Sequence, residues 1–384
     1  MADGSPHLKL NVYTAIAEIG EAAWNGCAGD DNPFVSYGFL SALEDSGSVG
    51  KRSGWFPRYA VLRDAQDEIV AIAPAYGKSN SYGEYVFDHA WANAMERAGG
   101  NYYPKLQIAV PFSPVPGPRI LARPGFPVSA MAAALQQLAG ELGCSSAHAT
   151  FCTQAEYDAL GAAGWLQRLG MQFHWENAGY QSFDDFLAAM SSRKRKVMKR
   201  ERRDAQEGLT FEALSGAALT PAVWEDFYKF YLSTVDRKWG GAYLTQKFFN
   251  LLGARLGEKV VLMIASRDGK PIAGALNLRS DTVLYGRNWG STEDVPFLHF
   301  ELCYYQAIDY AIKHGLSRVE AGAQGEHKIQ RGYLPRPTYS AHWIEHPGLR
   351  RAVAQFLDAE RPAMRDNMAA LAEDSPFKKT GEAG

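Results

Sequence analysis

The sequence has few cysteines and no long apolar segment. Its 384 residues include 4 Cys, and no two of them have the CxxC spacing of redox or metal motifs. Residues 1–10 lack the apolar core of a signal peptide, and no segment approaches the roughly 18 uncharged apolar residues that a membrane span needs. We therefore expect a cytoplasmic protein with reduced thiols and no membrane span.

An excess of charge of either sign is also missing. Lys and Arg number 40 against 42 Asp and Glu, for a formal net charge of −2. This balance excludes a globally basic nucleic-acid binder, although a local basic patch stays open. Hydrophobic residues make up 46 % and charged residues 21 %, which excludes wholesale disorder. A chain of this length buries roughly three quarters of its unfolded surface and needs no disulfides to form a core.

Common cofactor and nucleophile motifs are absent as well. The sequence holds no GxGxxG or Walker-type phosphate loop and no GxSxG elbow. His299 and Glu301 stand two positions apart on a predicted helix, where side chains diverge, and the other histidines lack ligand spacing. We expect neither a metal nor a tightly bound cofactor.

The order of the predicted elements repeats once along the chain. In the first half we expect strands at 11–19, 57–64, 68–76, 106–111, 147–151 and 169–176, and helices at 36–46, 128–142 and 154–163. In the second half we expect helices at 183–207, 221–234, 245–256, 297–314 and 349–371, and strands at 209–214, 260–267, 271–278, 282–288, 318–321 and 340–345. The pattern predicts an α+β fold with domains 1–180 and 181–384. The alternative is one large mixed α/β domain.

Several stretches carry a resemblance to a known family. In the second half they are a basic helix at 191–208, a hairpin at 261–278, a strand at 284–290, and residues 319–325 continued by His327-Lys328 and Arg331-Gly332-Tyr333. These stretches resemble the FemAB-like branch of the GNAT-like acyltransferases. Residues 82–88 and 102–107 resemble, more narrowly, a bacterial subfamily of peptidoglycan-biosynthesis-like or N-acetyltransferase-like proteins.

The resemblance implies tandem GNAT-like domains with mixed central sheets flanked by helices. It also implies a transferase that moves an acyl or aminoacyl group from a co-substrate, acyl-CoA or aminoacyl-tRNA, to an amine on a small molecule or peptide. The sequence departs from the family pattern at two places that affect the choice of co-substrate and the substrate contacts. The segment 113–119 is Pro-rich and offers no Gly-rich pyrophosphate loop, and Ile329-Gln330 replaces the Phe-Lys pair of Fem-type transferases. The alternatives are an acyl-CoA transferase acting on a small molecule or amino sugar, and a non-catalytic tandem module that binds tRNA or a cell-wall precursor.

The segment 325–333 places an acid, an imidazole, an ammonium and a guanidinium just after a predicted strand. His327 is a candidate base because an unperturbed imidazole has a pKa of ~6.5. Lys328 and Arg331 are candidates to hold a phosphate or to stabilise an oxyanion. Tyr333, at the end of the segment, is a candidate substrate contact. The alternative is a surface loop with incidental charges.

Further candidates lie on the predicted strands. Glu320 could act as the base or orient His327, and the alternative is a structural ion pair with a nearby arginine. Tyr285 and Arg287 point to the same face of their strand because they are two positions apart. With Asn277 on the neighbouring strand they could line an acceptor pocket, although a lone tyrosine is more often part of a core.

Two further segments are candidates for binding. Residues 193–203 hold eight Lys or Arg and one Glu, and the basic residues surround the predicted helix. Arg193, Arg195 and Arg200 are therefore candidates to bind phosphate, including that of tRNA, and the alternative is a solvated helix face. Residues 79–105 are rich in Tyr and Trp and include charged side chains, so this segment either lines a ligand pocket or caps the core of the first domain.

Overall fold

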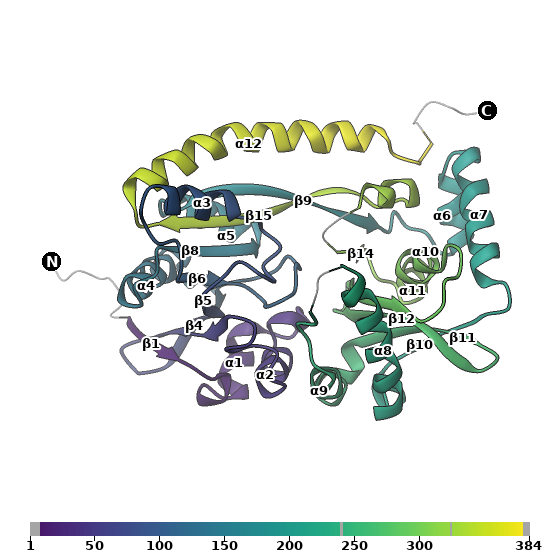
Figure 1. The fold of residues 1–384 in the computed structure, drawn as a ribbon, viewed down its shortest axis with the longest axis horizontal. Helices are drawn as coiled ribbons and strands as arrows, with labels where there is room; N and C mark the ends of the chain where they lie inside the picture. The colour runs from purple at the N-terminus through teal and green to yellow at the C-terminus, as the bar shows by residue number, and fades with distance from the viewer. Residues whose placement is uncertain (1–7, 239–240, 323–324, 379–384) are drawn as a thin grey trace. The chain divides into compact units, whose positions relative to one another are not determined.

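The computed structural model describes residues 8–238, 241–322 and 325–378. The chain forms two compact units (Figure 1). Unit 1 takes in the described residues up to Gly170 together with Pro337–Met364, and unit 2 takes in Met171–Arg336 together with the described residues from Arg365. The chain passes between the units within β9 (Leu166–Glu176), within β15 (Leu334–Ile344) and within the long helix α12 (Pro347–Glu373).

The expected division into 1–180 and 181–384 differs from these units at residues 171–180, which belong to unit 2, and at residues 337–364, which belong to unit 1. The cause of the second difference is pairing and packing late in the chain. Residues 339–344 of β15 pair with β8 (Ser146–Cys152), and Leu349, Val353 and Leu357 of α12 pack with Trp91 and Tyr102 of unit 1.

Unit 1 contains two sheets. Its remaining strands are β1 (Lys9–Tyr13), β2 (Trp55–Pro57), β3 (Tyr59–Arg63), β4 (Ile69–Ala73), β5 (Ala75–Lys78), β6 (Lys105–Ile108) and β7 (Leu121–Ala122). Its helices are η1 (Ile16–Glu18), α1 (Glu21–Ala28), η2 (Pro33–Val35), α2 (Tyr37–Asp45), α3 (His89–Arg97), α4 (Val128–Glu141) and α5 (Gln154–Ala162). The smaller sheet has the order β1-β3-β4-β7, and the other runs β15-β8-β6-β5-β2 with β6 and β8 parallel.

The two faces of the sheet β15-β8-β6-β5 differ in chemistry. Leu106, Ile108 and Ala147 point to one face, where they join the apolar core with Leu135 of α4. The alternating positions are polar yet buried, and they are Tyr76, Lys78, Lys105, Gln107, Ser146, His148, Thr150, Ser340 and His342. Residues 79–104, including α3, contact this second face, where Glu84 and Asp88 accept hydrogen bonds from Lys105 and Trp91 packs against His342.

Unit 2 has one sheet, in the order β10-β11-β12-β13-β14-β9. Its remaining strands are β10 (Thr210–Leu214), β11 (Val260–Arg267), β12 (Lys270–Arg279), β13 (Val283–Ser291) and β14 (Arg318–Glu320). Its helices are α6 (Phe183–Ala189), α7 (Ser192–Gln206), η3 (Gly216–Ala218), α8 (Pro221–Lys238), α9 (Gln246–Leu256), η4 (Gly257–Lys259), α10 (Leu298–Phe300), the π-helix η5 (Glu301–Tyr305), α11 (Gln306–Lys313) and the 3₁₀-helix η6 (Glu326–Arg331).

Helix α8 packs closely on the sheet of unit 2. A Cβ on Gly290 of β13 would lie 1.7 Å from the carbonyl oxygen of Phe230, so glycine is needed there. Strands β13 and β14 are parallel, and the other neighbours in this sheet whose register is known are antiparallel. The β13–β14 pairing runs from Val283↔Arg318 to Tyr285↔Glu320, while β13 itself continues to Ser291. Glu320 therefore stands where this ladder ends.

Several expected elements differ in detail. The helix expected at 183–207 is two helices, because Met190 leaves the helical conformation with a ψ of 157° and is fully buried between them. The helix expected at 297–314 is divided by the π-helix η5. The loop expected after β14 contains η6, and helices α1 and α3 were not expected. Among the described residues, no helix is long and apolar enough to cross a membrane.

Candidate functional site

The end of β14 brings buried polar groups of unit 2 together. Glu320 is 3 % exposed and stands opposite Tyr285 on one neighbouring strand and His174 on the other. Its Oε1 lies 3.1 Å from Nε of Arg318, and its Oε2 lies 4.0 Å from Nε2 of His174. Within the described ranges, neither Glu320 Oε2 nor His174 Nε2 has a hydrogen-bond partner. Both atoms are buried, and each can take up a proton.

Burial shifts the pKa values of these two groups in opposite directions. It raises the pKa of Glu320 to about 7, against the lowering effect of Arg318. Burial, together with the charges of Arg318, Arg336 and Lys328, lowers the pKa of His174 to about 3. The imidazole is therefore neutral at pH 7, and the carboxyl group is close to half ionised. Such a carboxyl can accept and return a proton at neutral pH.

Lys328 lies on η6 and is buried. Its Nζ donates a hydrogen bond to the carbonyl oxygen of Gly322 at 3.0 Å. Burial lowers the pKa of Lys328 to about 8, and its charge contributes to the low pKa of His174. Lys328 thus lies within electrostatic range of His174. The adjacent residues Ala323 and Gln324, which belong to the family-like stretch 319–325, lie outside the described residues.

The other predicted members of the η6 segment make different contacts. His327 is exposed, and its Nε2 lies 3.0 Å from the hydroxyl of Tyr304. Arg331 is buried, its Nη2 lies 2.9 Å from both carboxylate oxygens of Glu201, and its guanidinium lies 3.4 Å from the ring centroid of Phe300. The charge of Arg331 is therefore already paired inside the protein.

Two of the predicted substrate-binding side chains are buried and form hydrogen bonds within the protein. Tyr333 is fully buried in the core of unit 2, and its hydroxyl donates to the carbonyl oxygen of Tyr304. Asn277 is 1 % exposed, and its side-chain amide donates to the carbonyl oxygens of Val261 and Ala275 at 3.2 Å each, beside the irregularity in the β12–β13 ladder. Arg287, by contrast, is half-buried on β13 beyond the end of the β14 ladder.

The basic helix α7 has a buried face and a charged face. Met198, Glu201 and Ala205 are buried. The exposed basic face consists of Arg193, Lys196, Lys199, Arg200 and Arg203. The basic residues therefore do not surround the helix as the sequence suggested, because an acidic residue and two small or apolar residues occupy its inner side. Of the three predicted phosphate contacts, Arg193 and Arg200 lie on the exposed face, and Arg195 is half-buried.

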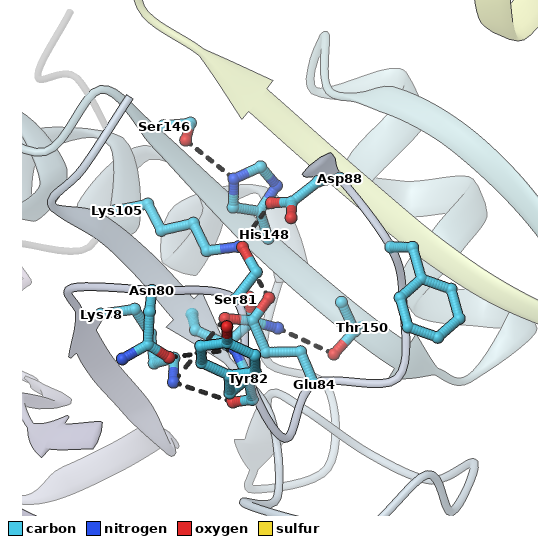
Figure 2. A network of polar contacts seen from close by, with 12 residues as sticks. Lys78, Asn80, Ser81, Tyr82, Glu84, Asp88, Lys105, Ser146, His148 and Thr150 are labelled. Atoms are coloured by element: carbon cyan, nitrogen blue, oxygen red, sulfur yellow. Dashed lines mark hydrogen bonds and ion pairs between the residues drawn. The ribbon is translucent and has the colours of Figure 1, made fainter. Parts of the chain in front are cut away.

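A second cluster of buried charges lies in unit 1, on the polar face of the sheet (Figure 2). The Nζ of Lys105 donates to Ser81 Oγ at 2.8 Å, to Glu84 Oε2 at 2.7 Å and to Asp88 Oδ2. The hydroxyl of Tyr102 also donates to Asp88 Oδ2, at 2.7 Å. These contacts use all three N–H groups of the Lys105 ammonium.

Lys78, on the neighbouring strand, is equally buried. Its Nζ donates to the carbonyl oxygen of Tyr82 at 3.1 Å and stands 3.9 Å from Glu84 Oε1 (Figure 2). The same atom lies 4.0 Å from the ring centroid of Trp55. Burial lowers the pKa of Lys78 to about 7 and raises that of Glu84 to about 7. This pair can therefore gain or lose a proton near neutral pH.

Three acceptor atoms of this cluster lack a donor. Glu84 Oε1, Asp88 Oδ1 and Gln107 Oε1 are buried without a hydrogen-bond partner in the part of the chain that the structure describes. Lys105 has no N–H left, but Lys78 Nζ stands 3.9 Å from Glu84 Oε1, and water or a ligand can supply the remaining donors. The segment 79–104 exposes Tyr82, Tyr85 and Phe87, which are 64 %, 37 % and 56 % accessible.

Two buried imidazoles extend this cluster. Nδ1 of His148 lies 2.8 Å from Nδ1 of His342, so one of these nitrogens carries the shared hydrogen. Their Nε2 atoms lie 2.8 Å from Ser146 Oγ and 3.1 Å from Ser340 Oγ. Burial lowers the pKa of His148 to about 3 and that of His342 well below its usual range. Both imidazoles are thus neutral at pH 7.

Sequence reasoning found part of these two sites. It named Glu320 and Lys328 but not His174, and it named residues 79–105 as a candidate region but not Lys78, His148 or His342. The missing information is strand register, since His174 faces Glu320 only through the β9–β14 pairing. Within the described residues, no group of three or more His, Cys, Asp or Glu is arranged to hold a metal ion.

Comparisons with known proteins give a family and a fold. A family model described as FemAB-like, peptidoglycan biosynthesis/recognition, matches residues 15–379. The chain also resembles the C-terminal domain of an Agrobacterium fabrum protein described as a lysylphosphatidylglycerol synthetase, with 12 % identity, 90 % of this chain and 97 % of that chain covered, and a TM-score of 0.55.

Two further solved structures are similar. FemX has 11 % identity and a TM-score of 0.53 over 90 % of this chain and 100 % of its own. L-PGS from Bacillus licheniformis has 11 % identity and a TM-score of 0.51 over 85 % and 98 %. The predicted α+β fold of tandem GNAT-like domains is confirmed. No curated protein matches the sequence.

Proposed function

This chain belongs to the FemAB-like family, and from that premise we propose that it transfers an acyl or aminoacyl group to an amine and so forms an amide bond. The observation that carries the proposal is the carboxyl group of Glu320. It is buried at the end of the β13–β14 ladder, its Oε2 is unpaired among the described residues, and burial raises its pKa to about 7. A base whose pKa is close to the working pH transfers protons efficiently.

The proposed step forms one bond and breaks another. The nitrogen of the acceptor amine attacks the activated carbonyl carbon of the donor, and the proton of the amine moves to Glu320 Oε2. The bond from the carbonyl carbon to the carrier oxygen or sulfur then breaks, and the carrier leaves with the electron pair and takes up the proton. Lys328 stabilises the oxyanion that forms between these events, and the neutral imidazole of His174 borders the base.

We assign the donor to the exposed basic face of α7, and we favour aminoacyl-tRNA over acyl-CoA. A row of five cations suits a ligand with many phosphates. The Pro-rich segment 113–119, in contrast, has Arg119 as its one basic side chain, and this guanidinium is buried. It donates to the carbonyl oxygens of Val115, Gly117, Pro118 and Thr150. The proposed place of action is the cytoplasm, where both donors occur.

The test measures amide formation by the full chain. Charged tRNA and acyl-CoAs serve as donors, and nucleotide-linked muropeptides and amino sugars serve as acceptors, with products identified by mass spectrometry. Glu320→Gln is expected to lower kcat at least about 100-fold. Glu176→Gln, which changes an exposed carboxylate on β9, is the matched control and is expected to have no effect. Undiminished transfer by Glu320→Gln would remove Glu320 from the mechanism, and no transfer from any donor would refute the proposed function.

A second candidate function is binding without catalysis, of tRNA or of a cell-wall precursor. The unpaired acceptors Glu84 Oε1, Asp88 Oδ1 and Gln107 Oε1 of unit 1 favour it, because a ligand rich in hydroxyl or amino groups would supply their donors. Calorimetric titration of a nucleotide-linked muropeptide separates the two functions. A pure binder would bind equally well with Glu320→Gln and would form no product, whereas Gln107→Leu would weaken its binding.

A further inference from the structure

A buried ion pair joins the basic helix α7 to the η6 turn. Glu201 is 6 % exposed on the inner side of α7, and both of its carboxylate oxygens lie 2.9 Å from Nη2 of Arg331. The hydroxyl of Tyr305, on the π-helix η5, donates to the same carboxylate. Because this pair is shielded from water, its geometry is held more strongly than that of a surface ion pair.

Arg331 transmits this anchoring to the rest of η6. Its Nη1 donates to the carbonyl oxygen of His327 at 2.8 Å, so one guanidinium bridges the helix and the turn. A second link runs from Lys194 of α7 to Gln330. Lys328, the proposed oxyanion group, lies inside the segment that these two links hold.

The η6 turn is held by its own hydrogen bonds, by the core and by side-chain links to α7. The amides of Lys328, Gly332 and Tyr333 donate within the turn itself, to Gly325, Ile329 and Lys328. Ile329 and Tyr333 are also buried in the apolar core of unit 2. A 3₁₀ turn of this length holds its geometry poorly without side-chain anchors. The Glu201–Arg331 pair is a buried polar anchor of η6, and it connects the turn to the helix that carries the exposed basic face.

We propose that Glu201 is a positioning residue: through Arg331 it fixes the η6 turn that carries Lys328, and it couples that turn to phosphate binding on α7. The coupling is reciprocal, so a ligand on the exposed basic face stabilises the ordered turn, and the ordered turn strengthens binding on that face. The expected effect of Glu201 on catalysis rests on the proposed function. Its expected effect on the order of the η6 turn does not.

The first experiment needs no knowledge of the reaction. Hydrogen–deuterium exchange followed by mass spectrometry is measured for peptides that cover η6 in the free protein. Glu201→Gln keeps the shape of the side chain and removes its charge, and it is expected to speed exchange of these amides at least about tenfold. Arg202→Gln is the matched control, because it breaks the ion pair of the neighbouring residue with Glu301 on η5 and leaves η6 untouched. Equal protection of η6 in the two variants would overturn the proposal.

A double variant separates positioning from stability. Glu201→Gln leaves Arg331 buried without its counter-ion, whereas Glu201→Gln with Arg331→Gln removes both charges and is expected to recover most of the lost stability. If Glu201 acts by positioning, η6 still exchanges fast in the double variant, and kcat for transfer stays low with little change in KM. Recovery of both protection and kcat by the double variant would show a merely structural role.

The coupling is tested with unfractionated tRNA as the probe. Saturating tRNA is expected to slow exchange of the η6 amides in the natural protein and to have a much smaller effect in Glu201→Gln. Bound tRNA without any change at η6 would refute the coupling. Failure of tRNA to bind would instead refute the proposed donor, and the exchange comparison of the free variants would still decide the role of Glu201.

Discussion

Oε2 of Glu320 lies 4.0 Å from Nε2 of His174, and in the described part of the chain neither atom has a hydrogen-bond partner. Burial favours the neutral form of both groups, so it raises the pKa of the acid to about 7 and lowers that of the base to about 3. A neutral pair avoids the cost of burying two ions. The consequence is a carboxyl group that the fold keeps protonated in mild acid and that ionises only near neutrality.

Glu320 makes the natural protein less stable as the pH rises. The folded state holds the Glu320 proton up to a pKa of about 7, whereas the unfolded chain loses it near the ordinary value of 4.5. Stability is therefore complete below pH 4.5 for this group and falls as the pH rises toward 7, by on the order of 3 kcal/mol in all. Glu320→Gln, which cannot ionise, is expected to be relatively more stable at pH 8 than at pH 5. Urea unfolding at both values measures the difference.

Glu176→Gln serves as the control for this prediction, since Glu176 is exposed and paired with Arg336. Its stability difference from the natural protein is expected to change little or in the opposite sense, because the Arg336 hydrogen bond lowers the pKa of Glu176. A stability difference for Glu320→Gln that is the same at pH 5 and pH 8 would contradict the raised pKa.

The buried imidazole pair of unit 1 has the opposite pH effect. Burial lowers the pKa of His148 to about 3 and that of His342 well below its usual range, while in the unfolded chain both take up protons near pH 6.5. Stability is therefore lost as the pH falls below 6.5, by about 1.4 kcal/mol per pH unit for each imidazole. The double variant His148→Gln with His342→Gln is expected to show a shallower decline between pH 6 and 4. Denaturant unfolding across that range measures the slope, and His89→Gln, which changes an exposed histidine, should keep the natural slope.

The sequence predicted the secondary-structure elements correctly where local sequence signals agree with the tertiary structure. The Asp268-Gly269 turn marks the β11–β12 hairpin, and apolar alternation marks the strands on either side. The break at Met190 was missed because it depends on tertiary contacts: the side chain is buried in the core, and the backbone forms an antiparallel bridge with Phe377. The return of residues 337–364 to unit 1 depends on long-range pairing, which local patterns do not contain.

The sequence identified only part of the candidate site, because long-range strand pairing brings the other part to it. Glu320 and Lys328 stand in a motif-like stretch, but His174 joins them through the β9–β14 register. Tyr333 and Arg331 have the residue types expected of a site, yet the structure buries one in the core and pairs the other with Glu201. A sequence shows which side chains can bind a ligand, whereas contacts within the fold decide which of them are still available.

Removal of Lys105 is expected to destabilise unit 1 strongly. Its ammonium is fully buried and pairs with Glu84 and Asp88, so Lys105→Met leaves Asp88 without its ion-pair partner and Glu84 with Lys78 alone. The expected loss is about 3–5 kcal/mol in urea unfolding at pH 7.5. The triple variant with Glu84→Gln and Asp88→Asn is expected to recover most of it, because neither carboxylate is left as a buried anion. Lys270→Met, at an exposed position, should change stability by less than about 0.5 kcal/mol.

The exposed basic face of α7 should govern the salt dependence of tRNA binding. In the triple variant Arg193→Ala, Lys196→Ala, Arg200→Ala, three cations that can displace counterions from phosphates are lost. The slope of log Kd against log salt concentration is expected to fall by about 2, with little change in unfolding free energy, because all three side chains are exposed. Filter binding of unfractionated tRNA between about 50 and 200 mM salt measures the slope.

Charge loss elsewhere in unit 2 is the control for that slope. Lys247, Lys270 and Arg365 are exposed and lie on other elements of the unit, so their triple alanine variant has the same net charge as the α7 variant. If binding depended only on net charge, the two variants would lose the same slope. Because phosphates must lie next to the cations to release counterions, we expect the control to keep nearly the natural slope. Equal slopes in both variants would show that α7 is a solvated helix with no phosphate site.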